Sequence, residues 1–195
     1  MKNYLHPHYI QLILIKLYEY YWYVINIIYA KYWTIDIPFK QKFRGLVMWN
    51  KLPHSKITIG NNCTFLSTET SNLIGINTPC IISTLKSGAI IEIGDNSGFS
   101  GTVIGCAKYI KIGNNVRCGA NTLITDSDWH LDDTRSGKPA EVIIEDNVWL
   151  GVNSTVLKGV TIGSNSVIGA NSVVTKSIPA NVIAAGNPCK IIKQL

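Results

Sequence analysis

The sequence predicts an all-β fold, a three-sided solenoid of short stacked strands, preceded by an amphipathic α-helical segment. Between Ile144 and Thr175, an aliphatic residue opens each block of six. A period of six fits neither a helix, which repeats every 3.6 residues, nor an amphipathic strand, which repeats every 2. It fits a parallel β-helix in which three strands and three corners make one turn of 18 residues. Aliphatic residues recur at that distance in the pairs Ile144 and Ile162, Leu150 and Ile168, and Val156 and Val174.

The composition is that of a folded chain with a basic C-terminal part. With 195 residues, 46% of them hydrophobic and 15% charged, the chain is predicted to form one core and not to be disordered. The formal net charge is +6. No acid follows Asp146, whereas Lys158, Lys176, Lys190 and Lys193 do, which suits a polyphosphate ligand or an anionic surface. The alternative is that these lysines only keep the solenoid soluble.

The five cysteines form no CxxC pair and are odd in number. Cys63 and Cys118 fall at inward positions of the repeat and are expected to act as small core hydrophobes. No compact apolar segment with a small-residue cleavage site is recognised near the start. These observations favour a cytoplasmic location, with contact to the inner membrane surface as an option.

Residues 1–45 are predicted to form an N-terminal helical segment, and residues 46–195 the solenoid domain. Lysine and glutamate interrupt the apolar stretch 9–33, so it contains no uncharged run of 18 residues. On a helix, Lys16, Glu19 and Asn26 lie opposite an apolar face. We expect that face to contact the solenoid or a neighbouring subunit, and peripheral membrane contact through residues 9–33 is the alternative. The face comprises Ile10, Leu14, Leu17, Tyr21, Val24 and Ile28.

One large break interrupts the repeat. Ile57 opens the first clear rung, the turns from 63 to 90 are irregular, and one extra residue between Ile93 and Ile112 predicts a bulge near Lys108–Tyr109. Ile112 and Ile144 are 32 residues apart, which leaves 14 more than one turn needs. The surplus lies within residues 126–141, which we call the flap. A loop that leaves a strict solenoid is where such scaffolds carry binding and chemistry.

The flap contains His130, the candidate catalytic group. A neutral imidazole can take a proton from a hydroxyl that attacks a carbonyl, and it needs an acceptor on its other nitrogen to fix the tautomer. Asp126 and Asp128 are the candidates for that role. An ordinary surface histidine is the alternative. A zinc site needs three or four suitable side chains, so no metal is predicted.

The chain resembles the left-handed β-helix hexapeptide-repeat acyltransferases, in the group of galactoside, maltose, xenobiotic and surface-polysaccharide O-acetyltransferases. The resemblance extends from Ile57 to the C-terminus. It rests on Asp-Ser-Asp-Trp-His at 126–130, on Val-Trp-Leu-Gly at 148–151, on the rungs from 159 to 170, and on Ala-Gly-Asn-Pro-Cys-Lys at 185–190.

The resemblance implies a homotrimer that binds acetyl-CoA between subunits. The family's catalytic histidine matches His130, and its tryptophan after the loop matches Trp149, at the acceptor and pantetheine end. Trp129 is expected beside the acceptor. The remaining cofactor contacts match Gly151, Ala170, Thr175 and Lys176 along the late coils, and Lys190 and Lys193 at the nucleotide end, where cations suit phosphates.

One departure concerns the acceptor. Galactoside and maltose acetyltransferases carry an asparagine in an earlier coil, where this chain has Phe99-Ser100-Gly101-Thr102. Ser100 replaces it, or the acceptor differs. We therefore predict an O-acetyltransferase that acts on a sugar hydroxyl of a surface polysaccharide or its precursor. The alternatives are an N-acetyltransferase of an amino sugar or antibiotic and a non-catalytic binding solenoid. A nucleic-acid role is not predicted.

Overall fold

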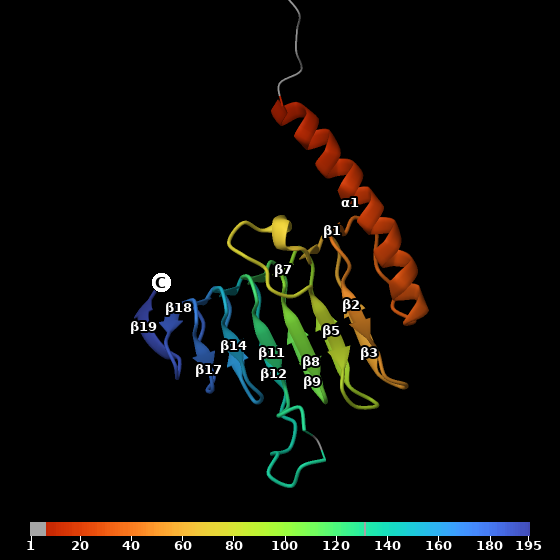
Figure 1. The fold of residues 1–195 in the computed structure, drawn as a ribbon. Helices are drawn as coiled ribbons and strands as arrows, with labels where there is room; N and C mark the ends of the chain where they lie inside the picture. Colours follow the sequence, from red (N-terminus) through yellow and green to blue (C-terminus); the bar gives the residue numbers. More distant parts are fainter. Residues whose placement is uncertain (1–6, 131) are drawn as a thin grey trace, which may run out of the picture.

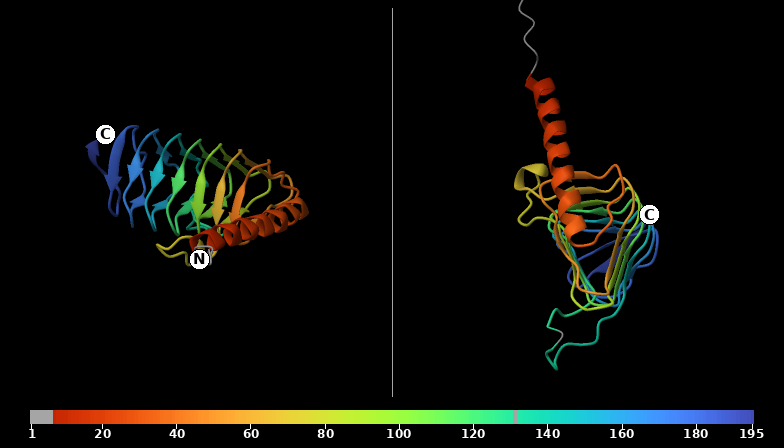
Figure 2. Two further views of the ribbon diagram at one scale, coloured as in Figure 1. Left: turned by 90° about the horizontal axis from the view of Figure 1, so that it is seen from above. Right: turned by 90° about the vertical axis from the view of Figure 1, so that its right-hand side faces the viewer.

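The computed structural model describes residues 7–130 and 132–195, apart from the side chains of residues 7, 8 and 10. Helix α1 (Pro7–Tyr32) lies across one end of a three-sided solenoid, and the flap hangs from one corner of it (Figure 1). Seen along its axis, the solenoid is a triangular prism (Figure 2). Within the described residues, no helix is long and apolar enough to cross a membrane.

Three sheets form the walls of the prism. Sheet A contains β1 (Lys42–Arg44), β4 (Thr64–Leu66), β7 (Gly98–Ser100), β10 (Arg117–Cys118), β13 (Trp149–Leu150), β16 (Val167–Ile168), β18 (Val182–Ala185) and β19 (Lys190–Gln194). Sheet B contains β2 (Met48–Asn50), β5 (Ile81–Thr84), β8 (Val103–Cys106), β11 (Leu123–Thr125), β14 (Thr155–Val156) and β17 (Val173–Val174). Sheet C contains β3 (Lys56–Ile59), β6 (Ile90–Ile93), β9 (Tyr109–Ile112), β12 (Val142–Ile144) and β15 (Thr161–Ile162).

The register is the one that the repeat predicts. Ile144 pairs with Ile162, Leu150 with Ile168, and Val156 with Val174, all in parallel. These six side chains are fully buried and form columns through the core. Burial of each is worth roughly 1.5–3 kcal/mol, so the columns stabilise every coil against its neighbours. The predicted parallel β-helix is confirmed.

Asparagine shapes the corners between strands. The C-to-A corner carries asparagines with positive φ, which asparagine tolerates better than most residues. Several of their side chains bond to the asparagine one coil further along, as Asn147 does to Asn165. Each corner is therefore tied to the next while its strands remain only two to four residues long.

The solenoid begins earlier than the sequence indicated. Strand β1 starts at Lys42 and pairs with β4, so the first coil lies partly before the boundary expected at residue 46. Its Phe43 ring stacks on Phe65, and Phe65 on Phe99, with ring centroids 5.3 and 5.2 Å apart. Aromatic residues fill the core of sheet A in these coils, where aliphatic residues fill it later. That change hid the first coil from a search for aliphatic rungs.

Two large excursions leave the solenoid, not the single one predicted. The flap leaves the B-to-C corner after β11 and returns at β12. A second loop, residues 67–80, leaves the A-to-B corner after β4 and includes the short 3₁₀ helix η1 (Glu69–Ser71). Phe65 and Ile82 are 17 residues apart, where regular rungs need 6. The irregular spacing between 63 and 90 was the sequence signal for this loop, which we call the A/B loop.

Helix α1 contacts the solenoid through the face opposite to the one expected. Asn26 is fully buried, donates to Gly45 O at 3.0 Å and accepts from Val47 N at 2.9 Å. Glu19 accepts from Arg44 Nε at 2.7 Å and lies 3.2 Å from Lys42 Nζ. The first coil has no preceding coil to satisfy its backbone, so the polar side chains of α1 supply the bonds. Trp22, Tyr23, Tyr29 and Trp33 pack beside them.

The predicted apolar face of α1 points away from the solenoid. Its members Leu14, Leu17, Tyr21, Val24 and Ile28 are all exposed, and the side chain of Ile10 lies outside the described residues. The periodicity was correct, but a hydrophobic stripe alone does not say what covers it.

The five cysteines are free and buried. Cys63 and Cys118 point inward as predicted. Burial raises the pKa of the Cys63 thiol to about 11.

Candidate functional site

Asp126 holds the root of the flap. Its carboxylate is fully buried and accepts the backbone N–H groups of Ala107, Lys108 and Tyr109 at 2.6, 2.6 and 2.8 Å. Cys106 Sγ also donates to it, at 3.4 Å. These amides belong to the predicted bulge near Lys108–Tyr109, where eight residues separate Ile104 from Ile112. Asp126 therefore closes the bulge and does not orient His130, contrary to the prediction.

Asp128 ties the flap to the next coil. Its carboxylate accepts Gly137 N at 2.9 Å and forms a short ion pair with Lys158, in the corresponding corner one coil later. The hydrogen bond from Lys158 is the main reason that the pKa of Asp128 is lowered. Lys158, which entered the sequence analysis only as one of the C-terminal cations, thus anchors the flap.

His130 stands exposed on the flap. Its backbone N–H donates to Asp128 O at 2.8 Å, and its carbonyl accepts Ser136 Oγ. Within the described residues, its imidazole meets no hydrogen-bonding partner of the same chain. Neither predicted acid is thus placed to fix its tautomer in a single copy.

Trp129 fixes the direction of the flap as it leaves the sheet. It adopts φ 66°, and its ring lies over Gly105, where a Cβ would come within 2.4 Å of the ring. Glycine at 105 is therefore required for this contact. The ring is 43% exposed and lines a groove over sheet B with Tyr29, Trp33 and Met48. Next to it, the hydroxyl of Ser127 is buried without a hydrogen-bonding partner.

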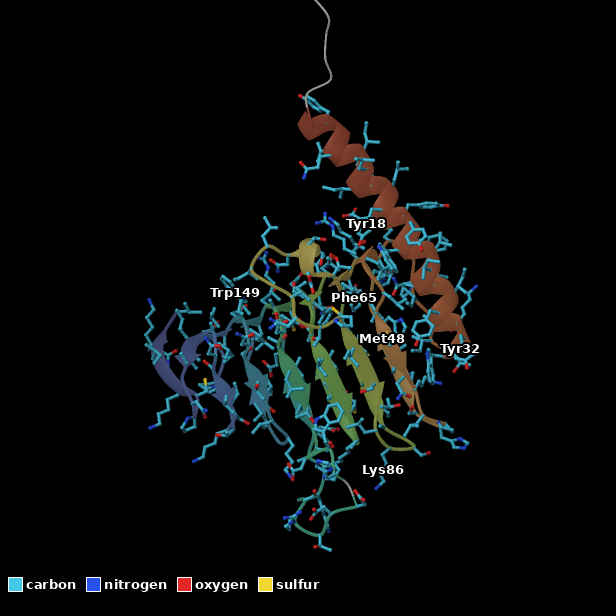
Figure 3. All side chains as sticks on the ribbon, in the orientation of Figure 1. Tyr18, Tyr32, Met48, Phe65, Lys86 and Trp149 are labelled. Atoms are coloured by element: carbon cyan, nitrogen blue, oxygen red, sulfur yellow. The ribbon has the colours of Figure 1, made fainter. Side chains whose placement is uncertain are left out.

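Trp149 marks a second groove, at the A-to-B corner. The groove has a volume of about 430 Å³ and contains Trp149, Gly151 and Ala170, three of the predicted cofactor residues. Asn72 and Ile74 of the A/B loop form its other wall. Figure 3 shows Trp149 at the edge of the solenoid that carries the A/B loop, opposite to the flap.

The A/B loop brings an asparagine to the predicted acceptor residue. Ser100 is buried, and its hydroxyl accepts Asn72 Nδ2 at 3.2 Å. Strand β7 itself contains no asparagine, and the A/B loop supplies Asn72 from 28 residues earlier in the chain. Sequence reasoning missed Asn72 because it lies in the irregular turns.

Sequence reasoning also missed Arg117. It pairs with Trp149 in adjacent strands, and both line a hollow of about 490 Å³ on sheet A. Allowing for the flap, Arg117 lies one turn before Trp149, so repeat counting could have found it.

The remaining predicted residues divide between two edges of the prism. Thr175 and Lys176 are exposed and follow β17 at the B-to-C corner, on the same edge as the flap. Lys190 and Lys193 are exposed on β19, which adds antiparallel to the end of sheet A. In one chain, the flap edge carries His130, Thr175 and Lys176, and the sheet A edge carries the Trp149 groove.

The chain matches a family model described as the hexapeptide repeat of succinyl-transferase, over residues 141–176. It is 40% identical over 114 residues to the galactoside O-acetyltransferase of Escherichia coli, covering 55% of this chain and 56% of that protein. It is 42% identical over 114 residues to a putative acetyltransferase of Saccharomyces cerevisiae, covering 55% and 58%. The chain thus spans little more than half the length of these relatives.

Among solved structures, the chain superposes on an N-acyltransferase from Bacillus cereus with a TM-score of 0.61 and 22% identity, covering 80% of this chain and 81% of that one. This similarity concerns the fold. The structure and the repeat define the chain as a left-handed parallel β-helix built from hexapeptide repeats. Within that class its sequence is similar to a galactoside O-acetyltransferase and to a putative acetyltransferase, which confirms the resemblance drawn from the motifs.

Proposed function

We propose that the protein is an acetyl-CoA-dependent O-acetyltransferase of a sugar hydroxyl, with His130 as general base and active sites between copies in a homotrimer. The observation that carries this proposal is the division of the site. The one flap histidine lies at the B-to-C corner and the Trp149 groove at the A-to-B corner, and the imidazole has no partner within the described part of its own chain. In the proposed trimer, parallel prisms pack side by side, with the flap of one copy against the groove of the next.

The groove suits an extended pantetheine arm. Small residues line it, and Gly151 stacks between Gly119 and Gly169, so that backbone faces the groove along three coils. Lys190 and Lys193 lie at the end of the same sheet, where point charges attract phosphates. We place Lys176 and Thr175 of the flap edge at the opposite wall of the cleft.

The chemistry is proton transfer by one imidazole. His130 takes the proton of the acceptor hydroxyl while that oxygen forms its bond to the thioester carbonyl carbon. The C–S bond then breaks, and the protonated imidazole returns the proton to the leaving sulfur. The N–H groups of Trp149 and Gly151 already donate to Ser166 O and Ile168 O. We therefore assign oxyanion stabilisation to the N–H of Val152, the next amide in the groove.

The acceptor is proposed to bind between the A/B loop and Trp149. Asn72 and Ser100 offer polar contacts, and the half-exposed indole of Trp149 offers a flat apolar surface for a sugar ring. This groove is open at the surface, and it therefore suits a surface-polysaccharide precursor better than a buried small-molecule pocket would suit one.

Activity is tested by thiol release from acetyl-CoA with hydroxyl-only and amine-bearing sugars. We expect release with the hydroxyl acceptors. We also expect CoA at a hundred times its Kd to stabilise the fold by about 2.7 kcal/mol, visible as a rise in Tm. Turnover with amines alone would favour an N-acetyltransferase, and absence of CoA binding would leave only a binding solenoid.

The role of His130 is tested by His130→Asn, with His54→Asn as the matched control on the other solenoid histidine, which is also exposed. General-base assistance is worth roughly 10²–10⁴-fold, so kcat should fall by that factor in His130→Asn alone, with CoA binding unchanged. Comparable rates in both variants would refute the assignment.

The shared site is tested by complementation. His130→Asn removes the base, and Ala170→Trp fills the groove at an exposed position. When the two inactive variants are coexpressed, random trimers contain interfaces that join an intact flap to an intact groove, so about a quarter of wild-type activity should return. No recovery would place the site within one chain.

A further inference from the structure

Helix α1 has an apolar face that nothing in the described chain covers. We call it the outer face, because it lies opposite the side that carries Asn26 and Glu19. Its exposed fractions are high, for example 61% for Leu17, 62% for Ile28 and 77% for Tyr32. Figure 3 shows side chains projecting from α1 on the side away from the solenoid, with Tyr32 labelled at the C-terminal end of the helix. The outer face consists of Ile13, Leu14, Leu17, Tyr20, Tyr21, Val24, Ile28 and Tyr32.

The outer face is continuous along the helix. Its members follow one another at spacings of three and four residues or lie side by side, which places them on one side of an α-helix. Soluble proteins seldom leave so extended an apolar stripe in water. The solenoid does not need it, since Asn26 and the aromatic residues around it already attach α1 to the first coil.

The charges around the outer face have one sign. Lys16 precedes Leu17 by one residue, which is about 100° around the helix, so it borders the outer face and does not lie opposite it as expected. Lys31 lies beside the outer face near the C-terminal end, and both lysines are exposed. Glu19, the one acid of α1, faces the solenoid, where Arg44 and Lys42 neutralise it. Three tyrosines lie among the aliphatic residues, and tyrosine favours the boundary between water and hydrocarbon because its ring is apolar and its hydroxyl polar.

We propose that the outer face of α1 docks on a lipid bilayer surface with anionic headgroups, and that α1 lies in the plane of that surface. Aliphatic and tyrosine side chains enter the boundary between headgroups and acyl chains, while Lys16 and Lys31 contact the phosphates. The proposal does not depend on acyl transfer. If the protein both transfers acetyl groups and docks through α1, the helix keeps the solenoid beside acceptors that are carried on lipid.

The experiment is sedimentation of the full chain with vesicles of phosphatidylcholine alone or with 30% phosphatidylglycerol. Leu17→Gln/Ile28→Gln removes two exposed aliphatic side chains from the outer face, and glutamine keeps helix propensity. Leu73→Gln/Leu195→Gln is the matched control, because both leucines are exposed and neither belongs to the outer face. We expect the outer-face variant to lose about tenfold or more in vesicle partitioning, and the control to bind like wild type.

A charge variant separates headgroup attraction from apolar insertion. Lys16→Gln/Lys31→Gln should weaken binding to the anionic vesicles about fivefold per lysine at low salt, with little change on phosphatidylcholine. Circular dichroism and Tm should be unchanged in every variant, since all substituted side chains are exposed.

Three results would overturn the proposal. The first is absence of wild-type binding to both vesicle types. The second is binding that the outer-face variant retains. The third is wild-type self-association that Leu17→Gln/Ile28→Gln abolishes without any vesicle binding, which would identify the outer face as a contact between copies.

Discussion

The A/B loop and the flap both leave the solenoid, but the chain holds them in different ways. Asn121 fixes the A/B loop by accepting Asn77 N at 2.8 Å and donating to Gly75 O at 3.1 Å, and Ile76 is buried beneath it. The flap is held at its root, by Asp126 and by Asp128 with Lys158, and its His130 is exposed. The A/B loop is thus hydrogen-bonded back to the solenoid, whereas the flap presents the candidate catalytic residue His130 outward.

The difference explains why the proposed site draws on a second copy of the chain. A side chain that the chain itself satisfies can serve as part of a preformed groove. A polar side chain that projects into solvent with no partner gains its orientation only from a substrate or a neighbour. Four substitutions sharpen this contrast, from the largest expected effect to the smallest.

Asp126→Ala should cause the largest loss of stability. Its carboxylate satisfies three backbone N–H groups, and each donor left unsatisfied in a buried place costs about 1–3 kcal/mol, so we expect the free energy of unfolding to fall by about 3 kcal/mol or more. Urea denaturation measures it. Asp128→Ala is the control at the exposed acid two residues later, and equal losses in the two variants would contradict the buried role of Asp126.

Gly101→Ala should disturb the A/B loop. A Cβ there would lie 2.7 Å from both Ile76 Cγ2 and Thr78 O, with φ at +54°. We expect a loss of roughly 2–3 kcal/mol from overpacking and left-handed strain. Gly88→Ala is the matched control, because φ there is +80° but nothing lies within 4 Å of its Cβ. Denaturation curves that shift equally would show that the contact with the loop does not matter.

Asn121→Gly should loosen the A/B loop without straining its corner, since glycine accepts positive φ. Two hydrogen bonds to the loop disappear, and we expect a loss of about 1 kcal/mol. In an acetyl-transfer assay, the KM for the acceptor should rise while kcat changes little. Asn153 lies at the same corner one coil later and its side chain bonds to Asn171, so Asn153→Gly should leave the KM unchanged.

Lys158→Met should have the smallest effect on stability, because the ion pair with Asp128 is partly exposed. Its main result should be a fall of kcat by a few fold as the flap loses its anchor, with Lys158→Arg restoring most of it. An unchanged kcat in Lys158→Met would show that the anchor does not position His130.

The pH dependence of the same anchor follows from the pKa of Asp128, which is lowered from 3.8. A depressed carboxyl pKa stabilises the fold above 3.8, and that contribution disappears as the pH falls through the lower folded value. The Asp128 carboxylate therefore stays ionised throughout the weakly acidic and neutral range. If activity falls on the acid side of neutrality, wild type and Lys158→Met should show the same midpoint in their pH–rate profiles.

Repeat counting found the flap because it interrupts aliphatic rungs on both sides. The A/B loop escaped because aromatic Phe43, Phe65 and Phe99 fill the core of sheet A in the coils around it. The same aromatic stack concealed the start of the solenoid at Lys42.

The role of Asp126 escaped for another reason. Its proximity to His130 in the sequence suggested a pair, but the amides that it binds come from residues 107–109, in the preceding coil. A sequence does not show which backbone groups lack partners until the coils are stacked.

The sequence by itself determined the solenoid, its register from Ile93 onward, the inward cysteines and the position of the flap, because a period of six admits one way of stacking the rungs. Only the tertiary structure decided which face of α1 meets the first coil. Without Asn26, the carbonyl of Gly45 and the N–H of Val47 would be buried without hydrogen-bonding partners. The polar side of α1 therefore faces the first coil, and the hydrophobic stripe faces outward. Periodicity describes an element, whereas its partners depend on what the neighbouring element leaves unsatisfied.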